Sequence, residues 1–234
     1  MWKIGRIWLW SLWRLLVPRC CVVCGNTLQE GEEVVCLRCN MDLPRTGYHL
    51  KPDNPVERAL WAKMPLVRAS SYVYYRRGGS YASVLHLLKY KGRKDIALSL
   101  GKQAAAELMP SGFFEGVDVI VPVPLHPRKQ RSRGYNQSEW LARGLSAVTG
   151  IPVDGKSVTR DKDTDTQTHK SVMERQDNVA GIFSLHAPEA FKGKHVLIVD
   201  DVFTTGATVT ACADALDGVE GVQVSVLTLA VAGS

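Results

Sequence analysis

The residues HVLIVDDVFTTGATV at 195–209 constrain the fold more than any other part of the chain. The aliphatic run 195–199 predicts a buried parallel strand that ends in Asp200 and Asp201. A short turn at Val202 and Phe203 is expected next, and then five residues that open a helix: Thr204, Thr205, Gly206, Ala207 and Thr208. Glycine and hydroxyl side chains at a helix N-terminus suit a phosphate, and paired carboxylates one turn earlier suit the vicinal hydroxyls of a ribose. The segment therefore predicts a ribose 5-phosphate site.

Other phosphate-binding motifs do not match this segment. A Walker loop needs a lysine after the glycine, and a dinucleotide-binding fold needs a G-x-G-x-x-G pattern. Receiver domains also open on paired aspartates, but they need more chain than the 33 residues that follow Asp201. An ordinary strand-to-helix turn with a capping threonine stays open as the alternative.

The pattern of apolar residues predicts an α/β domain. Strands are expected over 66–75, 117–123, 157–160, 195–199 and 222–230, and helices over 81–90, 95–109, 137–148 and 207–216. Such alternation predicts a parallel sheet with helices on both faces, whose sites lie at the carboxyl ends of the strands. The 234 residues suffice for one such domain, expected at 63–234, and a small module at 1–62. The Pro/Asn-rich stretch 51–55 is expected to be a turn or linker.

Five of the six cysteines lie in the first module. The pairs Cys21-x-x-Cys24 and Cys36-x-x-Cys39 have the spacing of a four-cysteine zinc ribbon, whose closed site would make Zn²⁺ structural. Two disulfides or free thiols are the alternative. Cys20 competes with Cys21, which we prefer because both pairs then match. Cys212 is expected to be a core residue.

The net charge of +6 is concentrated in one region. Residues 76–133 hold 11 Lys and Arg against 4 Asp and Glu, a local balance of +7. A solvated basic face is one interpretation. An anion site, a nucleic-acid contact or both are the other.

The first 17 residues predict an amphipathic helix rich in tryptophan. Its apolar run is too short and too charged to span a bilayer, and no signal-peptide cleavage site follows it. We expect a cytoplasmic protein without a transmembrane segment. The helix is expected to pack on its own chain, with membrane association as the alternative.

Taken together, the motifs resemble those of the ComF/GntX family, within the type I phosphoribosyltransferases. The matching segments are CVVCG with CLRC, LLKYKG at 87–92, VPVPLHPRKQRSRGYNQSEWLA at 121–142, RDKDTDTQTHKSVMERQDNVAGIF at 160–183 and VLIVDDVFTTGATV at 196–209. They span nearly the whole chain. The zinc module together with RGYNQS makes the resemblance more specific than the ribose-phosphate motif alone.

The resemblance implies a type I phosphoribosyltransferase fold and 5-phosphoribosyl-1-pyrophosphate (PRPP) as ligand. Asp200 and Asp201 would bind the ribose hydroxyls, and residues 204–208 the 5′-phosphate. The loop after 117–123 would hold the pyrophosphate and its Mg²⁺ through Arg128, Lys129, Arg131, Arg133 and Gly134. Residues 161–171 take the place of a mobile loop over the ligand, and Gln167 and Arg175 match residues typical of the family. Lys89 matches a family lysine, and a simple surface lysine is the alternative.

Two functions fit this pattern. The family's link with competence suggests a PRPP-binding protein that serves DNA uptake, with single-stranded DNA and DNA-uptake proteins as partners. Tyr90 and Tyr135 would then stack on bases, or else lie in the core. The alternative is an active phosphoribosyltransferase of nucleotide metabolism, which displaces pyrophosphate from ribose C1 with an unidentified base or amine. The sequence names neither a catalytic residue nor that second substrate.

Overall fold

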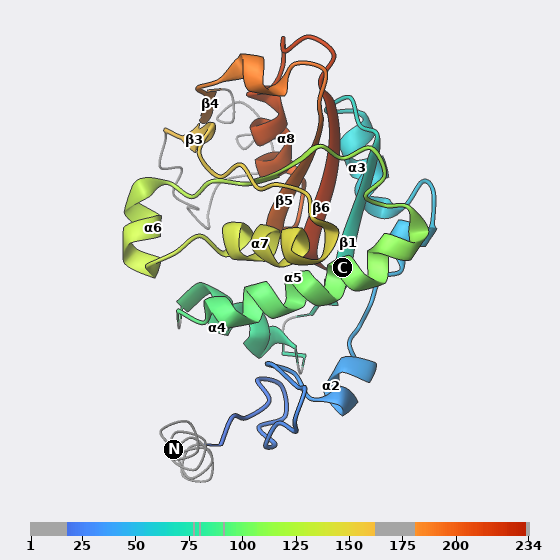
Figure 1. Ribbon diagram of the computed structural model, residues 1–234, viewed down its shortest axis with the longest axis vertical. Helices are drawn as coiled ribbons and strands as arrows, with labels where there is room; N and C mark the ends of the chain where they lie inside the picture. Colours follow the sequence, from blue (N-terminus) through green and yellow to red (C-terminus); the bar gives the residue numbers. More distant parts are fainter. Residues whose placement is uncertain (1–17, 77, 80, 91, 162–180, 233–234) are drawn as a thin grey trace, which may run out of the picture.

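A four-stranded parallel sheet forms the centre of the protein in its computed structural model (Figure 1). The structure describes residues 18–76, 78–79, 81–90, 92–161 and 181–232, and of Tyr90 only the backbone. The strands follow the order β1 (Arg68–Tyr75), β6 (Gln223–Ala232), β5 (His195–Phe203) and β2 (Val119–Pro122). All three pairings are parallel, so the strands end at one edge of the sheet.

Helices cover both faces of this sheet. The helices α4 (Ala82–Tyr90), α5 (Lys94–Leu108) and α7 (Gln137–Thr149) pack on one face, and α3 (Pro55–Trp61) and α8 (Ala207–Asp214) pack on the other. Strand β5 alternates accordingly: Leu197 and Val199 face α5 and α7, while Val196 and Ile198 face α8. The predicted parallel sheet with helices on both faces is confirmed.

Helices α5 and α7 approach each other through glycine. A β-carbon on Gly144 would lie 2.3 Å from the carbonyl oxygen of Leu98, and one on Gly101 would lie 2.4 Å from that of Leu141. The two helices therefore touch backbone to backbone. This contact fixes α7, whose N-terminus reaches the carboxyl edge of the sheet.

Several elements differ from the sequence-based expectations. Strand β5 continues to Phe203, where a turn was predicted at 202–203, because β6 supplies ladder partners as far as Val231. The basic segment holds a helix, α6 (Pro127–Arg133), and the stretch 51–55 runs into α3, which Asn54 opens with a capping box. Strand β3 (Val158–Arg160) pairs antiparallel with β4 (Phe183–Leu185), outside the main sheet.

The remaining described elements are short. They are α2 (Leu37–Met41) and three 3-10 helices, η1 (Tyr48–Leu50), η2 (Met109–Ser111) and η4 (Pro188–Phe191).

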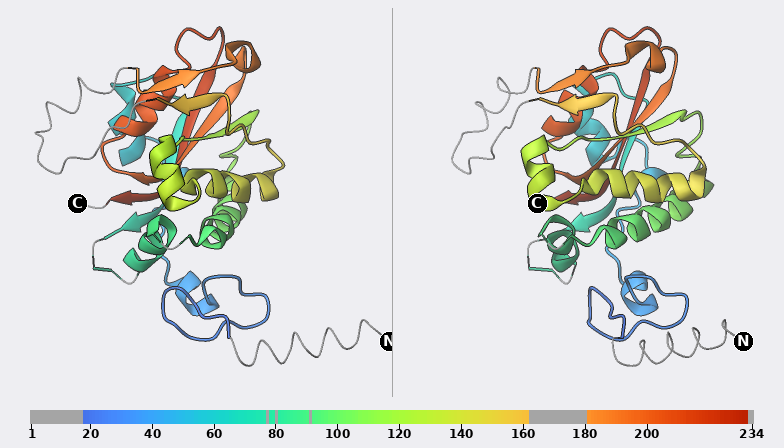
Figure 2. Two further views of the ribbon diagram at one scale, coloured as in Figure 1. Left: turned by 90° about the vertical axis from the view of Figure 1, so that its left-hand side faces the viewer. Right: turned by 60° about the vertical axis from the view of Figure 1, so that its left-hand side comes forward.

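The cysteine-rich segment lies at one end of the molecule, beneath α4 and α5 (Figures 1 and 2). Its link to the domain is built on β1. Thr46 Oγ1 donates to the carbonyl oxygen of Ser71, and Asn54 Nδ2 donates to that of Ala69 at 2.9 Å. Residues 43–61 therefore pack on the sheet domain. A division into 1–62 and 63–234 stays a prediction.

Among the residues that the structure describes, no helix is both long and apolar enough to cross a membrane. The predicted amphipathic helix at the N-terminus lies outside the described residues.

Candidate functional site

The two carboxylates that end the apolar part of β5 lie at the carboxyl edge of the sheet. The hydroxyl of Ser138, in the first turn of α7, donates to Oδ1 of Asp200 at 2.9 Å. The backbone N–H of Asp201 donates to the same oxygen at 2.8 Å. Both donors use Oδ1, so Asp200 is oriented while its second oxygen can serve a ligand hydroxyl.

Asp201 is oriented by a lysine from another element. Lys89 Nζ, near the end of α4, lies 3.2 Å from Asp201 Oδ2. The preceding residue of that helix is fixed as well, because the Tyr135 hydroxyl donates to the carbonyl oxygen of Leu88. The family lysine is therefore an ion-pair partner of the site and not a simple surface residue.

The pKa of the Asp200 carboxyl group is unusually high for an aspartate. Burial, together with the adjacent Asp201 carboxylate, raises the pKa of Asp200 to about 7. The hydrogen bonds from Asp201 and Ser138 and the charge of Lys89 oppose this shift. Asp200 therefore gains its charge close to neutral pH.

We expect Asp200→Asn to gain stability over the wild type as pH rises from 5 to 7. In the unfolded chain this carboxyl is ionised above about pH 4, whereas the folded one keeps its proton until about pH 7. The folded state thus binds more protons in this window, so wild-type stability falls as pH rises, and asparagine removes that dependence. Urea unfolding at several pH values measures the difference. A gap that stays constant with pH would contradict the raised pKa.

The loop after β5 lies against Leu60 of α3 and is bonded to Lys63, which follows that helix. Gly206 has a φ of 80° and is buried, and a β-carbon there would lie 2.9 Å from Leu60 Cδ2 and 3.0 Å from Phe203 Cζ. Lys63 Nζ donates to the carbonyl oxygen of Thr205 at 2.6 Å. The other four residues of the loop and the first turn of α8 are exposed or half-exposed: Thr204, Thr205, Ala207 and Thr208. This arrangement fits a phosphate at the start of α8.

The basic segment lies between the end of β2 and the start of α7. Asn136 closes it, because its Nδ2 donates to the carbonyl oxygen of Val123 at 3.0 Å and its Oδ1 accepts from Ser138 N at 3.1 Å. The segment thus shares the edge of the sheet with Asp200. Its cations on α6 are exposed (Arg128, Arg131) or half-buried (Lys129, Arg133), and Gly134 ends the helix with a φ of 79°.

Tyr135, one of the two aromatic residues expected to stack on bases, lies in the core. Tyr135 is 7% exposed and its hydroxyl is bound to Leu88, so it is a core residue. The side chain of Tyr90 lies outside the described part of the chain. The structure therefore gives no stacking role to Tyr135.

Four cysteines meet in the N-terminal module. The sulfur atoms of Cys21, Cys24, Cys36 and Cys39 all lie within 4.8 Å of one another. Cys20 is exposed and its sulfur instead faces the carbonyl oxygen of Pro18 at 3.6 Å, which favours Cys21 as the fourth ligand. Burial opposes ionisation of Cys21, but backbone N–H groups, chiefly of Cys24 and Cys36, lower its pKa to about 6. Four clustered thiols of this kind fit a tetrahedral metal such as zinc. Cys212 is fully buried in α8, as predicted.

Comparison with known proteins identifies the family. Residues 97–234 match the phosphoribosyl transferase domain. The DNA utilization protein YhgH of Escherichia coli strain K12 is 34% identical over 227 residues, covering 90% of this chain and 96% of that protein. This chain belongs to the ComF family of phosphoribosyltransferase-fold proteins.

Two further relatives carry competence in their names. Competence protein F of Haemophilus influenzae is 40% identical over 110 residues, which cover 46% of this chain and 48% of that protein. Competence protein ComFC of Bacillus subtilis is 24% identical over 207 residues, covering 85% and 79%. The ComF resemblance and the type I phosphoribosyltransferase fold predicted from the sequence are thereby confirmed.

Some contacts of the site were not anticipated from the sequence. Ser138 belongs to the RGYNQS motif, which signalled the family without indicating that it orients Asp200. Lys63 stands in a stretch that carried no motif, so its hydrogen bond to Thr205 had no sequence signal. Gln167 and Arg175, predicted for the mobile loop, lie outside the described residues.

Proposed function

We propose that this ComF-family protein binds PRPP at the carboxyl edge of the sheet. The observation that carries the proposal is the pair Asp200–Asp201, oriented by Ser138 and Lys89, beside a glycine loop that opens a helix. Asp200 and Asp201 accept the ribose hydroxyls. The loop Thr204–Thr205–Gly206–Ala207–Thr208 donates backbone N–H groups to the 5′-phosphate.

The basic helix α6 supplies the opposite side of the ligand. In this proposal Arg128, Lys129, Arg131 and Arg133 neutralise the pyrophosphate, and Gly134 lets the chain turn close to it. Pyrophosphate and carboxylate oxygens are the ligands that Mg²⁺ prefers, so Mg²⁺ is expected to bind with the ligand. Gln167 and Arg175 are proposed to close over the bound molecule.

The biological role that we propose is DNA uptake or utilization. The names of the relatives support it, since they refer to DNA utilization and to competence. Single-stranded DNA and DNA-uptake proteins are the proposed partners. The four-cysteine module is proposed to hold a structural Zn²⁺. A mobility-shift assay with single-stranded DNA across salt concentrations tests direct contact. Phosphate contacts predict a shift that weakens as salt rises, and absence of any shift counts against DNA as a direct partner.

The binding proposal predicts a large loss of affinity in the aspartate variants. We expect Asp200→Asn and Asp201→Asn each to weaken Mg²⁺-PRPP binding about 10- to 150-fold, because each removes a hydrogen bond to a charged group. Isothermal titration calorimetry measures the affinity. Asp217→Asn is the matched control, since Asp217 is exposed beyond the far end of α8.

Two results would refute the site. One is the absence of binding heat for the wild type with Mg²⁺ and PRPP. The other is wild-type affinity in both site variants.

Catalysis is the second candidate function, favoured by the paired carboxylates Asp200 and Asp201 beside a cationic helix. The reaction would displace pyrophosphate from ribose C1 by a base or amine, and the cations would stabilise the departing pyrophosphate. Pyrophosphate release is measured across a panel of bases and amines. Release with one acceptor establishes a transferase, whereas tight binding without release supports a PRPP-binding protein.

A further inference from the structure

The short helix α4 joins the N-terminal four-cysteine module to the proposed ribose-phosphate site. Tyr81 precedes the first residue of α4, and its hydroxyl donates to the carbonyl oxygen of Cys39. At the other end of α4, Leu88 accepts from Tyr135 and Lys89 pairs with Asp201. A nine-residue helix thus contacts a metal ligand at one end and a ligand-binding carboxylate at the other.

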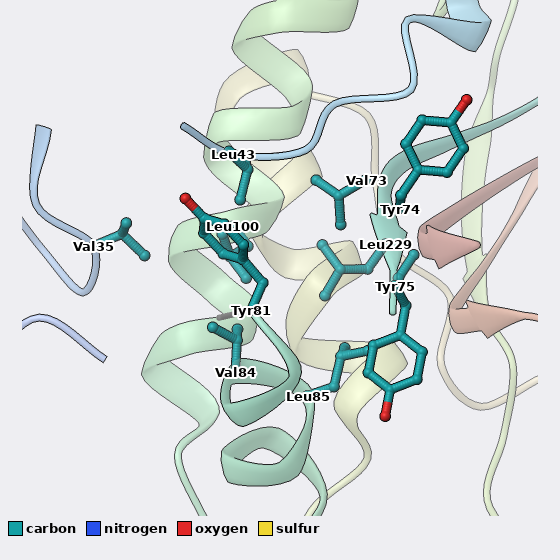
Figure 3. Close-up of a pocket in the computed structure, with 11 residues that line it drawn as sticks. Val35, Leu43, Val73, Tyr74, Tyr75, Tyr81, Val84, Leu85, Leu100 and Leu229 are labelled. Carbon is teal, nitrogen blue, oxygen red and sulfur yellow. The ribbon is translucent and has the colours of Figure 1, made fainter. Parts of the chain in front are cut away.

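The seam between the module and this helix is closely packed. Figure 3 shows Val35 and Leu43 of the N-terminal segment facing Tyr81, Val84 and Leu85, with residues of β1, β6 and α5 completing the lining. The space left between them is about 20 Å³, on the scale of one water molecule. Because packed interiors do not deform continuously, a shift of the module must move α4.

The cysteines themselves belong to this packed core. Cys21, Cys36 and Cys39 are buried together with Val84, Leu85 and Leu88 of α4. Loss of a metal from four clustered thiols would let the loops around Cys21 and Cys36 separate, because a bound metal is what holds such small modules folded. The hydrogen bond from Tyr81 to Cys39 is a contact that such a separation would break.

We infer that metal occupancy of the four-cysteine site controls PRPP affinity by setting the position of α4, with Tyr81 as the positioning residue. The inference rests on the proposed function and adds a regulatory link to it. The metal-bound module holds α4 so that Lys89 orients Asp201 and Leu88 holds Tyr135 next to the Asn136–Ser138 turn. Release of the metal loosens α4 and lowers affinity for the sugar pyrophosphate.

The test uses the full chain and a variant that keeps all four cysteines. We expect Tyr81→Phe to retain the zinc content of the wild type and to bind Mg²⁺-PRPP about 5- to 20-fold more weakly. Tyr72→Phe is the matched control, because it removes a hydroxyl from the same core that bonds to Glu107 at 3.0 Å, away from α4. The control is expected to keep wild-type affinity.

Two further measurements show whether the effect travels through α4. In a Lys89→Met background, Tyr81→Phe is expected to have a smaller effect on affinity than in the wild type, since the part that acts on Asp201 through Lys89 is already lost. Zinc removed with a chelator, followed by dialysis into Mg²⁺ buffer, is expected to lower affinity as Tyr81→Phe does, and returned zinc should restore it. Wild-type affinity in Tyr81→Phe, or an equal loss in Tyr72→Phe, overturns the inference.

Hydrogen exchange separates this inference from the proposed function. The amides of α4 should exchange faster in Tyr81→Phe than in Tyr72→Phe, with no ligand present. If the wild type binds no PRPP, the proposed function fails while the exchange data still test the link. If α4 exchanges equally in both variants, the link fails whatever the wild type binds.

Discussion

Gly144→Ala is expected to lower the free energy of unfolding by about 3 kcal/mol. The added methyl group would lie 2.3 Å from the Leu98 carbonyl oxygen, 2.9 Å from Gly101 Cα and 3.0 Å from Lys102 N. All three are backbone atoms of α5, so no side chain can rotate away. Relief requires the two helices to separate, and separation opens the core between them and the sheet.

Gly155→Ala is the matched control for this substitution. Its nearest neighbours would be Pro122 Cγ at 3.7 Å and Glu139 Cγ at 3.9 Å, which are ordinary contacts. We expect its stability to stay within about 0.5 kcal/mol of the wild type in urea unfolding. Similar losses in the two variants would show that the helices do not meet through Gly144.

Gly206→Ala is expected to abolish measurable PRPP binding while the chain stays folded. Alanine is disfavoured at a φ of 80° by about 1–2 kcal/mol, and its methyl group would press on Leu60 and Phe203. The loop can escape both penalties only by leaving the conformation in which we propose that its N–H groups bind the 5′-phosphate. A total of about 3 kcal/mol in loop conformation corresponds to a loss of affinity of more than 100-fold.

The control for the glycine loop is Gly218→Ala. Gly218 also has a positive φ, of 84°, but nothing lies within 4 Å of its added methyl group and it follows the far end of α8. It should lose stability by about 1 kcal/mol and keep its affinity for Mg²⁺-PRPP in calorimetry. Wild-type binding by Gly206→Ala would mean that the loop does not hold the phosphate.

The sequence predicts well those parts of the fold that depend on local pattern. The aliphatic run 195–199, the acidic pair and the Gly206 loop follow one another in the chain, so their order alone specifies a strand, a turn and a helix. The two cysteine pairs are local in the same sense. Choosing Cys21 over Cys20 needed only the matching of two spacings, and the clustered sulfur atoms agree with it.

The contacts that orient the site could not be predicted because they join distant segments. Lys89 meets Asp201, Ser138 meets Asp200 and Lys63 meets Thr205 only after the sheet has formed. The extension of β5 to Phe203 likewise depends on β6, which pairs with it. Helix α6 lacks an apolar face. Its sequence therefore showed a cluster of positive charge but no helical periodicity of apolar residues.

The order of strands has a consequence for biosynthesis. Strand β6 lies between β1 and β5, yet the ribosome makes it after every other strand of that sheet. Until residues 223–232 leave the exit tunnel, β1 and β5 each present an unpaired apolar edge to solvent or to another nascent chain. The sheet can therefore close only after residues 223–232 have been made, and chaperones that cover strand edges can act on β1 and β5 until then.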